Sequence, residues 1–161
     1  MTGSSSFYPG TVFAARGDVI LVVVNYRLNV LDILTTHDST LPANLGLWDQ
    51  HLALQWVRDN IDQSGVTLFG GSAGGSSVVY QMFSPLNSQE LFQRVISQSA
   101  NAVALSVVNR NTIEVNRLLG AEVNCSVNHQ FADCLRGKSA QELVKATTIP
   151  PSHRRRGIPP V

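Results

Sequence analysis

The chain has little of what marks several large classes of protein. None of its apolar runs reaches the roughly 18 residues that a membrane-spanning helix needs, so we expect no membrane span. Its net charge is only +1, which gives no indication of a nucleic-acid partner. The start, Met-Thr-Gly-Ser-Ser-Ser-Phe, lacks the basic and apolar regions of a signal peptide. With 161 residues, 43% of them hydrophobic, the chain can form one domain with a core.

Cysteine is also scarce. Cys125 and Cys134 are the two cysteines, nine positions apart. Taken alone they could be free thiols, the usual state in a cytosolic protein, or a bonded pair. The triplet Asn124-Cys125-Ser126 is in addition an acceptor sequence for N-glycosylation, although such triplets also arise by chance.

The most informative stretch is rich in glycine and serine. Residues 66–77 read Val-Thr-Leu-Phe-Gly-Gly-Ser-Ala-Gly-Gly-Ser-Ser. A β-prone run over 66–69 enters a Gly-x-Ser-x-Gly turn centred on Ser72, and a helix-compatible segment over 76–83 leaves it. Strand, sharp turn and helix are the context of a nucleophile elbow. The serine hydroxyl would stand near a helix N-terminus, whose free N–H groups can bind an oxyanion.

Two glycines frame this turn. Gly70 and Gly74 would let the strand and the helix pass close together, because neither residue carries a Cβ. A flexible turn without chemistry is the plainer interpretation, since the five-residue pattern also occurs by chance. A phosphate-binding loop does not fit, because no Gly-Lys-Ser/Thr follows and the glycines lack the dinucleotide-binding spacing.

Three strands are expected in all. The segment 18–26 holds a continuous apolar run, Val-Ile-Leu-Val-Val-Val, which is typical of a central parallel strand buried on both faces. The second strand is 66–69, and the third is expected over 94–98. Strands that alternate with helices predict the α/β class, with a mostly parallel sheet and right-handed crossovers.

A long helix is expected over Gly46–Ile61. Leu45, Leu52, Trp56 and Ile61 mark one apolar face, with polar residues opposite. The segment between Thr35 and Asn44 is polar and contains a proline, so a loop is expected there.

Two further helices are expected near the C-terminus. One covers 105–119, with Gly120 as its terminator. The other opens at Ser139-Ala-Gln-Glu142, a capping box. Pro150-Pro151 ends regular structure, so 151–161 is expected to be an irregular tail beyond a single domain over 1–150.

A series of short motifs follows in order over about residues 10–145. They are Asn25-Tyr-Arg-Leu28, Leu41-Pro-Ala-Asn-Leu-Gly-Leu-Trp-Asp-Gln50, Ala53-Leu-Gln-Trp-Val57, Asn60-Ile61, Phe69-Gly-Gly-Ser-Ala-Gly-Gly75, Ser84-Pro85, Phe92-Gln-Arg-Val-Ile-Ser-Gln-Ser99 and Cys134-Leu-Arg136. In these motifs the chain resembles the type-B carboxylesterase and cholinesterase family. The resemblance implies a partial α/β-hydrolase fold, incomplete at both ends, in a secreted or ER-lumenal protein. It also implies hydrolysis of small carboxylic esters by a Ser-Glu-His triad, without a cofactor or metal.

The resemblance assigns roles to individual residues. Ser72 falls on the nucleophile, and the N–H of Ala73 falls on one oxyanion donor. Arg27 and Asp49 match positions that form a buried ion pair, which is a matter of scaffold and not of chemistry. The two cysteines fall on a small-loop disulfide, which would stabilise the fold by roughly 2–3 kcal/mol in the chain-entropy model.

The chain also departs from the family pattern. Gly71 stands where the family usually has a glutamate, and Asn29 and Asp32 stand where it favours glycine. The family's triad acid and histidine lie further along than Val161, and its other oxyanion donors lie upstream. None of the chain's histidines, His37, His51, His129 and His153, matches the catalytic motif.

We therefore expect a fragment of a longer secreted esterase that is inactive alone. The alternatives are a non-catalytic cholinesterase-like protein that works by adhesion or binding, and a degenerate gene product. Non-catalytic relatives usually lose the serine itself, whereas Ser72 is intact.

Overall fold

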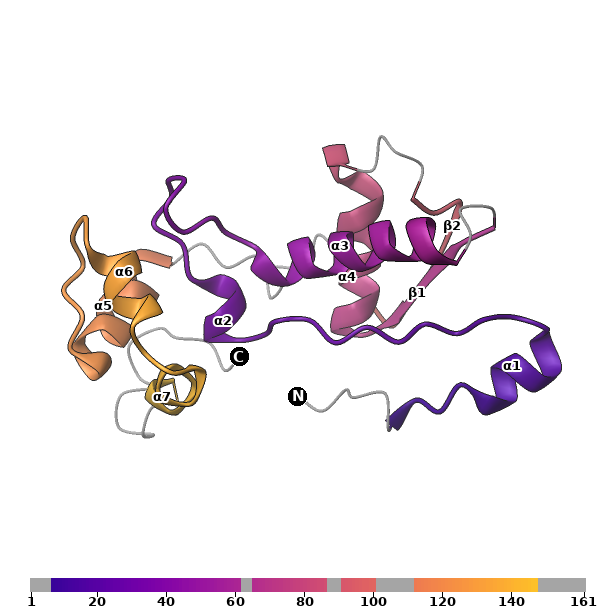
Figure 1. The fold of residues 1–161 in the computed structure, drawn as a ribbon, viewed down its shortest axis with the longest axis horizontal. Helices are drawn as coiled ribbons and strands as arrows, with labels where there is room; N and C mark the ends of the chain where they lie inside the picture. The colour runs from indigo at the N-terminus through magenta and orange to yellow at the C-terminus, as the bar shows by residue number, and fades with distance from the viewer. Residues whose placement is uncertain (1–6, 62–64, 87–90, 101–111, 148–161) are drawn as a thin grey trace.

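The computed structural model describes residues 7–61, 65–86, 91–100 and 112–147 (Figure 1). The expected tail over 151–161 lies outside these residues, as does 105–111 of one expected helix. The elements, in chain order, are α1 (Thr11–Gly17), α2 (Val30–Ile33), α3 (Leu45–Asn60), β1 (Thr67–Gly71), α4 (Ala73–Phe83), β2 (Arg94–Gln98), α5 (Thr112–Val123), α6 (Phe131–Arg136) and α7 (Ala140–Ala146). No helix among the described residues is both long and apolar enough to cross a membrane.

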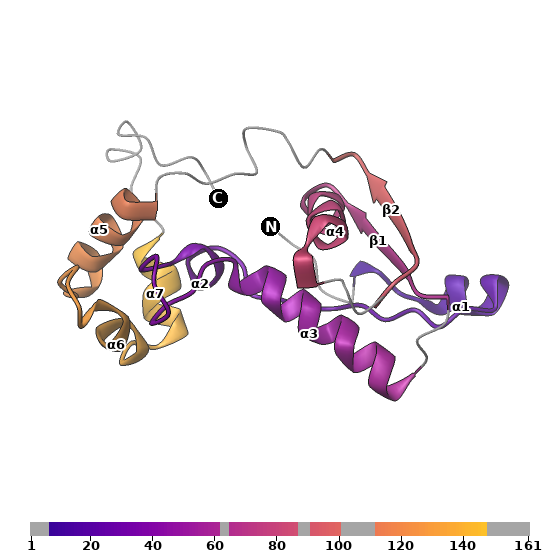
Figure 2. The ribbon, with the colours of Figure 1, turned by 90° about the horizontal axis from the view of Figure 1, so that it is seen from above.

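A small parallel sheet positions the glycine-rich turn. β1 and β2 pair in parallel, with Leu68 opposite Val95 and Phe69 opposite Ile96. The crossover helix α4 packs along both strands, and α3 runs past them (Figure 2). The expected strands at 66–69 and 94–98 are confirmed, as are the α/β class and its parallel pairing.

One face of this sheet is covered and the other is open. Leu54 of α3 forms a buried cluster with Leu91 and Phe92, and the half-buried Leu68 and Val95 pack against it. Side chains alternate along a strand, so Phe69 and Ile96 lie on the opposite face. Both remain 47% exposed.

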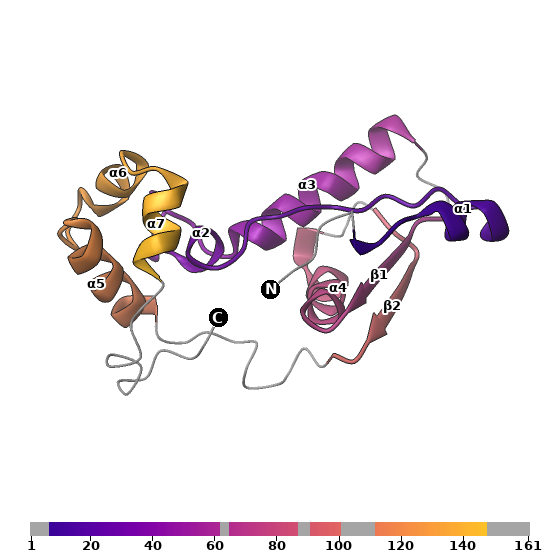
Figure 3. The same cartoon turned by 90° about the horizontal axis from the view of Figure 1, so that it is seen from below.

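A second core lies at the other end of the molecule, where α2 meets α5, α6 and α7 (Figure 3). Its buried members are Val30, Leu34, Leu119, Val123, Cys125, Phe131, Leu135 and Leu143. The expected capping box is present at the start of α7: the Ser139 hydroxyl accepts from the Glu142 N–H, and the Glu142 carboxylate accepts from the Ser139 N–H. These bonds satisfy backbone groups that a helix end leaves without partners.

The strand expected over 18–26 is wrong. The segment is an extended trace that runs from α1 back to α2 without strand pairing (Figure 1). Val19, Ile20 and Val22 are 49%, 73% and 40% exposed. An apolar run favours burial, but a strand also needs a neighbouring strand with which to form hydrogen bonds. In the described part of the chain, β1 and β2 pair only with each other.

The expected helix over 46–61 is confirmed as α3, but its buried face is wrong. Leu52 and Trp56 are 64% and 53% exposed, whereas His51 and Leu54 are buried. Apolar residues lie on more than one side of α3, so the side that becomes buried is decided by α3's neighbours.

The expected terminator Gly120 is also wrong, because Gly120 lies inside α5. A Cβ there would stand 2.4 Å from the Cys125 carbonyl oxygen and 3.2 Å from the Phe131 ring. Glycine at this position therefore allows α5 to pack closely against these residues. The helix ends at Asn124, whose φ of 56° takes the left-handed conformation typical of helix C-termini.

Candidate active site

The glycine-rich turn places Ser72 between the end of β1 and the start of α4. Its φ and ψ are 54° and −122°, a backbone conformation that side chains other than glycine rarely adopt. Such strain costs of order 1–3 kcal/mol and persists only where the surroundings impose it. Ser72 itself is exposed. A strained, exposed serine between a strand and a helix is the geometry of a nucleophile elbow.

Glycine is required at two positions around Ser72. A Cβ on Gly70 would stand 2.3 Å from the carbonyl oxygen of Gly74, closer than real contacts allow. A Cβ on Gly75 would stand 2.6 Å from the Ala100 Cβ and 2.9 Å from the Gln98 carbonyl oxygen. Gly74 itself has open space around its Cβ position, so what it contributes is its backbone and not its missing side chain.

The end of β2 holds the turn in place. The Ser72 N–H donates to the Gln98 carbonyl at 2.9 Å, and the Ser97 hydroxyl donates to the Gly75 carbonyl at 3.0 Å. Within the turn, the Ser76 N–H donates to the Ser72 carbonyl at 3.1 Å. The neighbouring strand therefore fixes both sides of the serine. Sequence reasoning did not identify Gly75, Ser97 or Gln98, because their importance arises from the β1–β2 pairing.

One donor for an oxyanion is present. Ala73 is the first residue of α4, and the N–H groups of a helix's first turn have no partner within the helix. The Ala73 N–H is therefore free to bind a negatively charged oxygen, with support from the helix dipole.

No described residue serves Ser72 as a base. The Ser72 hydroxyl has no hydrogen bond to any residue in the described ranges. His37 bonds the Thr112 hydroxyl through Nε2 at 2.6 Å, and His129 is exposed in the loop before α6. His51 packs edge-on against the Trp48 ring. Its pKa is lowered mainly by burial and to a smaller extent by the positive charge of Arg58. His153 lies outside the described residues.

Two glutamates of the described chain are engaged in other contacts. Glu114 pairs with Arg117 one turn along α5, and Glu142 caps α7. Among the residues that the structure describes, no cluster of three or more His, Cys, Asp and Glu side chains could hold a metal ion.

Arg27 and Asp49 form the expected ion pair, though not a buried one. Arg27 donates from Nε to Oδ2 of Asp49 at 2.8 Å and from Nη2 to Oδ1 at 2.6 Å. Their side chains are 46% and 24% exposed. The hydrogen bonds from Arg27 lower the pKa of Asp49 against a smaller opposing effect of burial. The ion pair connects α3 to the extended segment that precedes α2.

A second contact joins the same elements. The Asp32 carboxylate accepts from the Gly46 N–H in the first turn of α3 at 2.7 Å. A Cβ on Gly46 would stand 2.4 Å from the Arg27 carbonyl oxygen. Burial raises the pKa of Asp32, partly opposed by the Gly46 hydrogen bond. Arg27, Asp32 and Gly46 thus fix where α3 begins.

A shallow groove of about 470 Å³ lies on α3. It is lined by Arg27, Trp48, Asp49, His51, Leu52, Gln55, Pro85 and Leu86. Ser72 does not line it, so the groove is not the place where this serine would meet a substrate.

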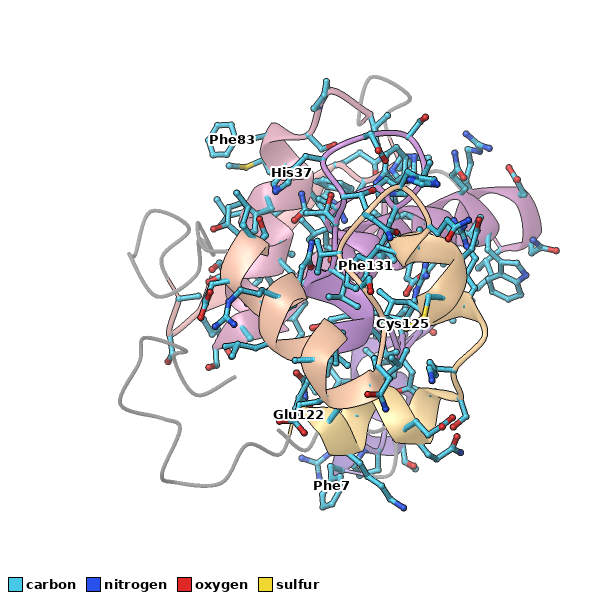
Figure 4. The ribbon with its side chains drawn as sticks, turned by 90° about the vertical axis from the view of Figure 1, so that its left-hand side faces the viewer. Phe7, His37, Phe83, Glu122, Cys125 and Phe131 are labelled. Atoms are coloured by element: carbon cyan, nitrogen blue, oxygen red, sulfur yellow. A yellow bond between two sulfur atoms is a disulfide. The ribbon has the colours of Figure 1, made fainter. Side chains whose placement is uncertain are left out.

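The cysteines are bonded to each other. Cys125 and Cys134 form a disulfide with their Cα atoms 5.8 Å apart, as the family resemblance implied. The bond links the loop after α5 to α6, beside the buried Phe131 (Figure 4).

The parallel strands, the crossover helix and the strained turn at Ser72 are typical of an α/β-hydrolase with a serine elbow. Known proteins agree with this class. The sequence pattern of the Carboxylesterase family matches residues 1–160, so the chain belongs to the carboxylesterase family. The crystal structure of the Geobacillus stearothermophilus carboxylesterase EST55 is similar, with a TM-score of 0.79 and 34% identity over 91% of this chain and 32% of that one.

Similar sequences include proteins of several names. Human bile salt-activated lipase is 41% identical over 89% of this chain, and mouse neuroligin-2 is 40% identical over 93%. Cholinesterase 1 of Branchiostoma lanceolatum is 41% identical over 89%. The chain spans 20%, 19% and 43% of the length of these relatives, respectively.

Proposed function

We propose that the chain carries the nucleophile region of a serine carboxylesterase, with Ser72 as the residue that becomes acylated. One observation carries the proposal: Ser72 is exposed and is held at a φ of 54° between β1 and α4. A turn without chemistry gains nothing from this strain, whereas an elbow uses it to present a hydroxyl. Family membership supports ester hydrolysis as the reaction.

The chemistry follows from the residues at the turn. The Ser72 hydroxyl oxygen attacks the carbonyl carbon of a carboxylic ester while a base takes its proton. The negative charge that develops on the carbonyl oxygen is stabilised by the Ala73 N–H. The alcohol leaves, the acyl group stays on Ser72, and water releases it as the acid. No cofactor or metal takes part in these steps.

In this proposal the base and the further oxyanion donors come from a longer protein, because none of the four histidines of the chain matches the family's catalytic motif. Neither His37, His51 nor His129 bonds the Ser72 hydroxyl. In serine proteases, loss of a single oxyanion donor lowers the rate by roughly 10²–10³. We therefore infer that the 161 residues alone hydrolyse esters no faster than background.

The disulfide supports a secretory location for the parent protein. Disulfides persist in oxidising compartments and are rare in the cytosol. Cys125 and Cys134 are bonded, and Cys125 is 3% exposed. We propose that the parent is secreted or resides in the ER lumen.

A non-catalytic binding protein is the second candidate. Mouse neuroligin-2 is as similar to this chain as bile salt-activated lipase is. Gly71, where the family usually has a glutamate, favours this candidate, and the intact Ser72 favours the esterase.

Hydrolysis of p-nitrophenyl butyrate separates these candidates. We would compare the 161-residue chain with a longer protein that contains it, each with Ser72→Ala and Ser77→Ala variants. Ser77 lies in the same helix, and its hydroxyl bonds the Ala73 carbonyl, so it is a matched control. The esterase proposal expects turnover by the longer protein that Ser72→Ala abolishes and Ser77→Ala retains. A folded longer protein without turnover would favour the binding protein, and Ser72-dependent turnover by the 161 residues would refute their inactivity.

A further inference from the structure

One sequence motif has no part in the esterase site. Asn124-Cys125-Ser126 is the single Asn-x-Ser/Thr triplet of the chain, because none of the other asparagines has serine or threonine two residues on. It lies where α5 ends and the loop to α6 begins. Chance alone could place such a triplet anywhere, so its surroundings decide whether it can be used.

Asn124 occupies an exposed helix terminus. Its φ of 56° is left-handed, which asparagine tolerates better than most residues. The next N–H, that of Cys125, donates back to the Gly120 carbonyl at 2.8 Å and closes the helix end. The Asn124 side chain is exposed, and its amide has no hydrogen bond to any residue that the structure describes.

The loop after Asn124 leaves room for a bulky group. All residues from 126 to 130 are exposed, and Val127 is 54% exposed although it is apolar. A glycan is large, polar and solvent-facing. Because Asn124 and this loop are both exposed, a glycan attached at Asn124 can extend into solvent without displacing a core residue.

The middle residue of the triplet is different. Cys125 is 3% exposed, forms a disulfide with Cys134 and donates its N–H to the Gly120 carbonyl. A glycosyltransferase must hold the asparagine amide and the serine hydroxyl together on an accessible stretch of chain. The folded turn does not offer its middle residue, so modification has to come before this turn forms.

We propose that Asn124 is an N-glycosylation site, modified before the Cys125–Cys134 bond closes. The inference rests on the secretory location proposed above and not on Ser72. The donor is an oligosaccharide linked to a lipid through diphosphate. The Asn124 amide nitrogen forms a bond to the anomeric carbon and loses a proton. The bond from that carbon to the phosphate oxygen breaks, and the lipid diphosphate leaves without any change in oxidation state.

The folded structure accepts the product of this reaction. After transfer, the Asn124 backbone can still take its left-handed conformation, and the two thiols can still be oxidised by a disulfide-exchange enzyme. The glycan and the disulfide are thus compatible on the same molecule, although their order is fixed. Slower disulfide closure leaves more time for transfer and should raise the glycosylated fraction.

The test uses the 161-residue chain with a secretory leader, expressed in mammalian cells. A peptide N-glycosidase should lower its mass by one glycan and leave aspartate at position 124. Ser126→Ala should remove the glycan while keeping Asn124 and Cys125, and Ser126→Thr should keep it. Cys134→Ser should raise the glycosylated fraction. Ser72→Ala should leave it unchanged, which separates this inference from the esterase proposal.

Peptide mapping without reductant then asks whether one molecule carries both groups. We expect the glycan and the Cys125–Cys134 bond on the same peptide pair. A chain that reaches the secretory pathway without a glycan would overturn the site. A glycan found only on molecules with free thiols would overturn its compatibility with the fold, and an unchanged fraction in Cys134→Ser would overturn the proposed order.

Discussion

Gly70 offers the sharpest test of how the elbow is built. A Cβ at this position would lie 2.3 Å from the Gly74 carbonyl oxygen and 2.4 Å from its carbon. Ordinary contacts begin near 3.4 Å, so the strand and the helix would have to separate by about 1 Å. The obstructing atoms are backbone and cannot rotate away. The neighbouring Gly71 is the matched control, because a Cβ there meets nothing within 4 Å.

The two substitutions should differ strongly in stability. Overpacking costs about 1–3 kcal/mol, and a backbone obstacle places Gly70→Ala near the upper end. Gly71→Ala should be neutral or stabilise by about 0.4–1 kcal/mol, because alanine restricts the unfolded chain. The difference of about 3 kcal/mol corresponds to roughly 6–12 °C in melting temperature for a domain of this size.

Thermal unfolding followed by far-UV circular dichroism measures this difference. Amide hydrogen exchange adds a local readout, since opening the turn in Gly70→Ala should expose the Ser72 N–H that donates to Gln98. Equal melting temperatures for Gly70→Ala and Gly71→Ala would refute the close passage of β1 and α4.

Three further predictions concern the scaffold. Reducing the disulfide should lower the free energy of unfolding by about 2–3 kcal/mol, checked by urea titration with and without reductant. Asp49→Asn should cost less than about 1 kcal/mol, because the Arg27 side chain is 46% exposed and solvent screens the pair; a loss of about 3–5 kcal/mol would mean a buried pair. Hydrogen bonds from Ser139 lower the pKa of Glu142. Its contribution to stability is therefore full above the unfolded pKa and is lost as pH falls through the lower folded value. Ser139→Ala should reduce that acid sensitivity, because the hydroxyl bond to the Glu142 carboxylate is lost while the bond from the N–H of residue 139 remains. An NMR titration in which the Glu142 pKa does not rise would contradict it.

Features with strong local causes could be predicted from the sequence. The elbow has its own glycines and a β-prone run before it, and α7 has its capping box, so each is encoded within a few residues. The helix α4 begins at Ala73, three residues before the expected start, because the turn at Ser72 passes directly into it. The disulfide followed from the family resemblance and could not be deduced from spacing alone.

Features decided by distant neighbours could not be predicted. The run over 18–26 is apolar enough for a buried strand, but pairing depends on a partner that the run does not contain. Trp56 is as apolar as a core residue and yet exposed, because α3 buries Leu54 instead. Gly120 was expected to end a helix, because glycine is common at helix C-termini. Its close contacts with the Cys125 carbonyl and Phe131 could not be predicted, because these residues come from further along the chain.

At the site, the same division applies. The motif predicts Ser72, Ala73 and Gly70, whereas Gly75 and Gln98 matter only because β2 lies beside β1. Asn29 stands where the family favours glycine, and its φ of 58° and ψ of −142° show that the position needs a glycine-like conformation. Asparagine tolerates this conformation here, and its side-chain oxygen accepts a hydrogen bond from the Val30 N–H at 2.7 Å.

Covalent labelling tests the central claim most directly. A fluorophosphonate reacts with an activated serine hydroxyl, and mass spectrometry of the digested protein locates the adduct. In a longer protein that contains this chain, we predict one adduct on Ser72, absent in Ser72→Ala and retained in Ser77→Ala. A folded protein that carries no adduct on Ser72, or an adduct on another serine instead, would contradict the account.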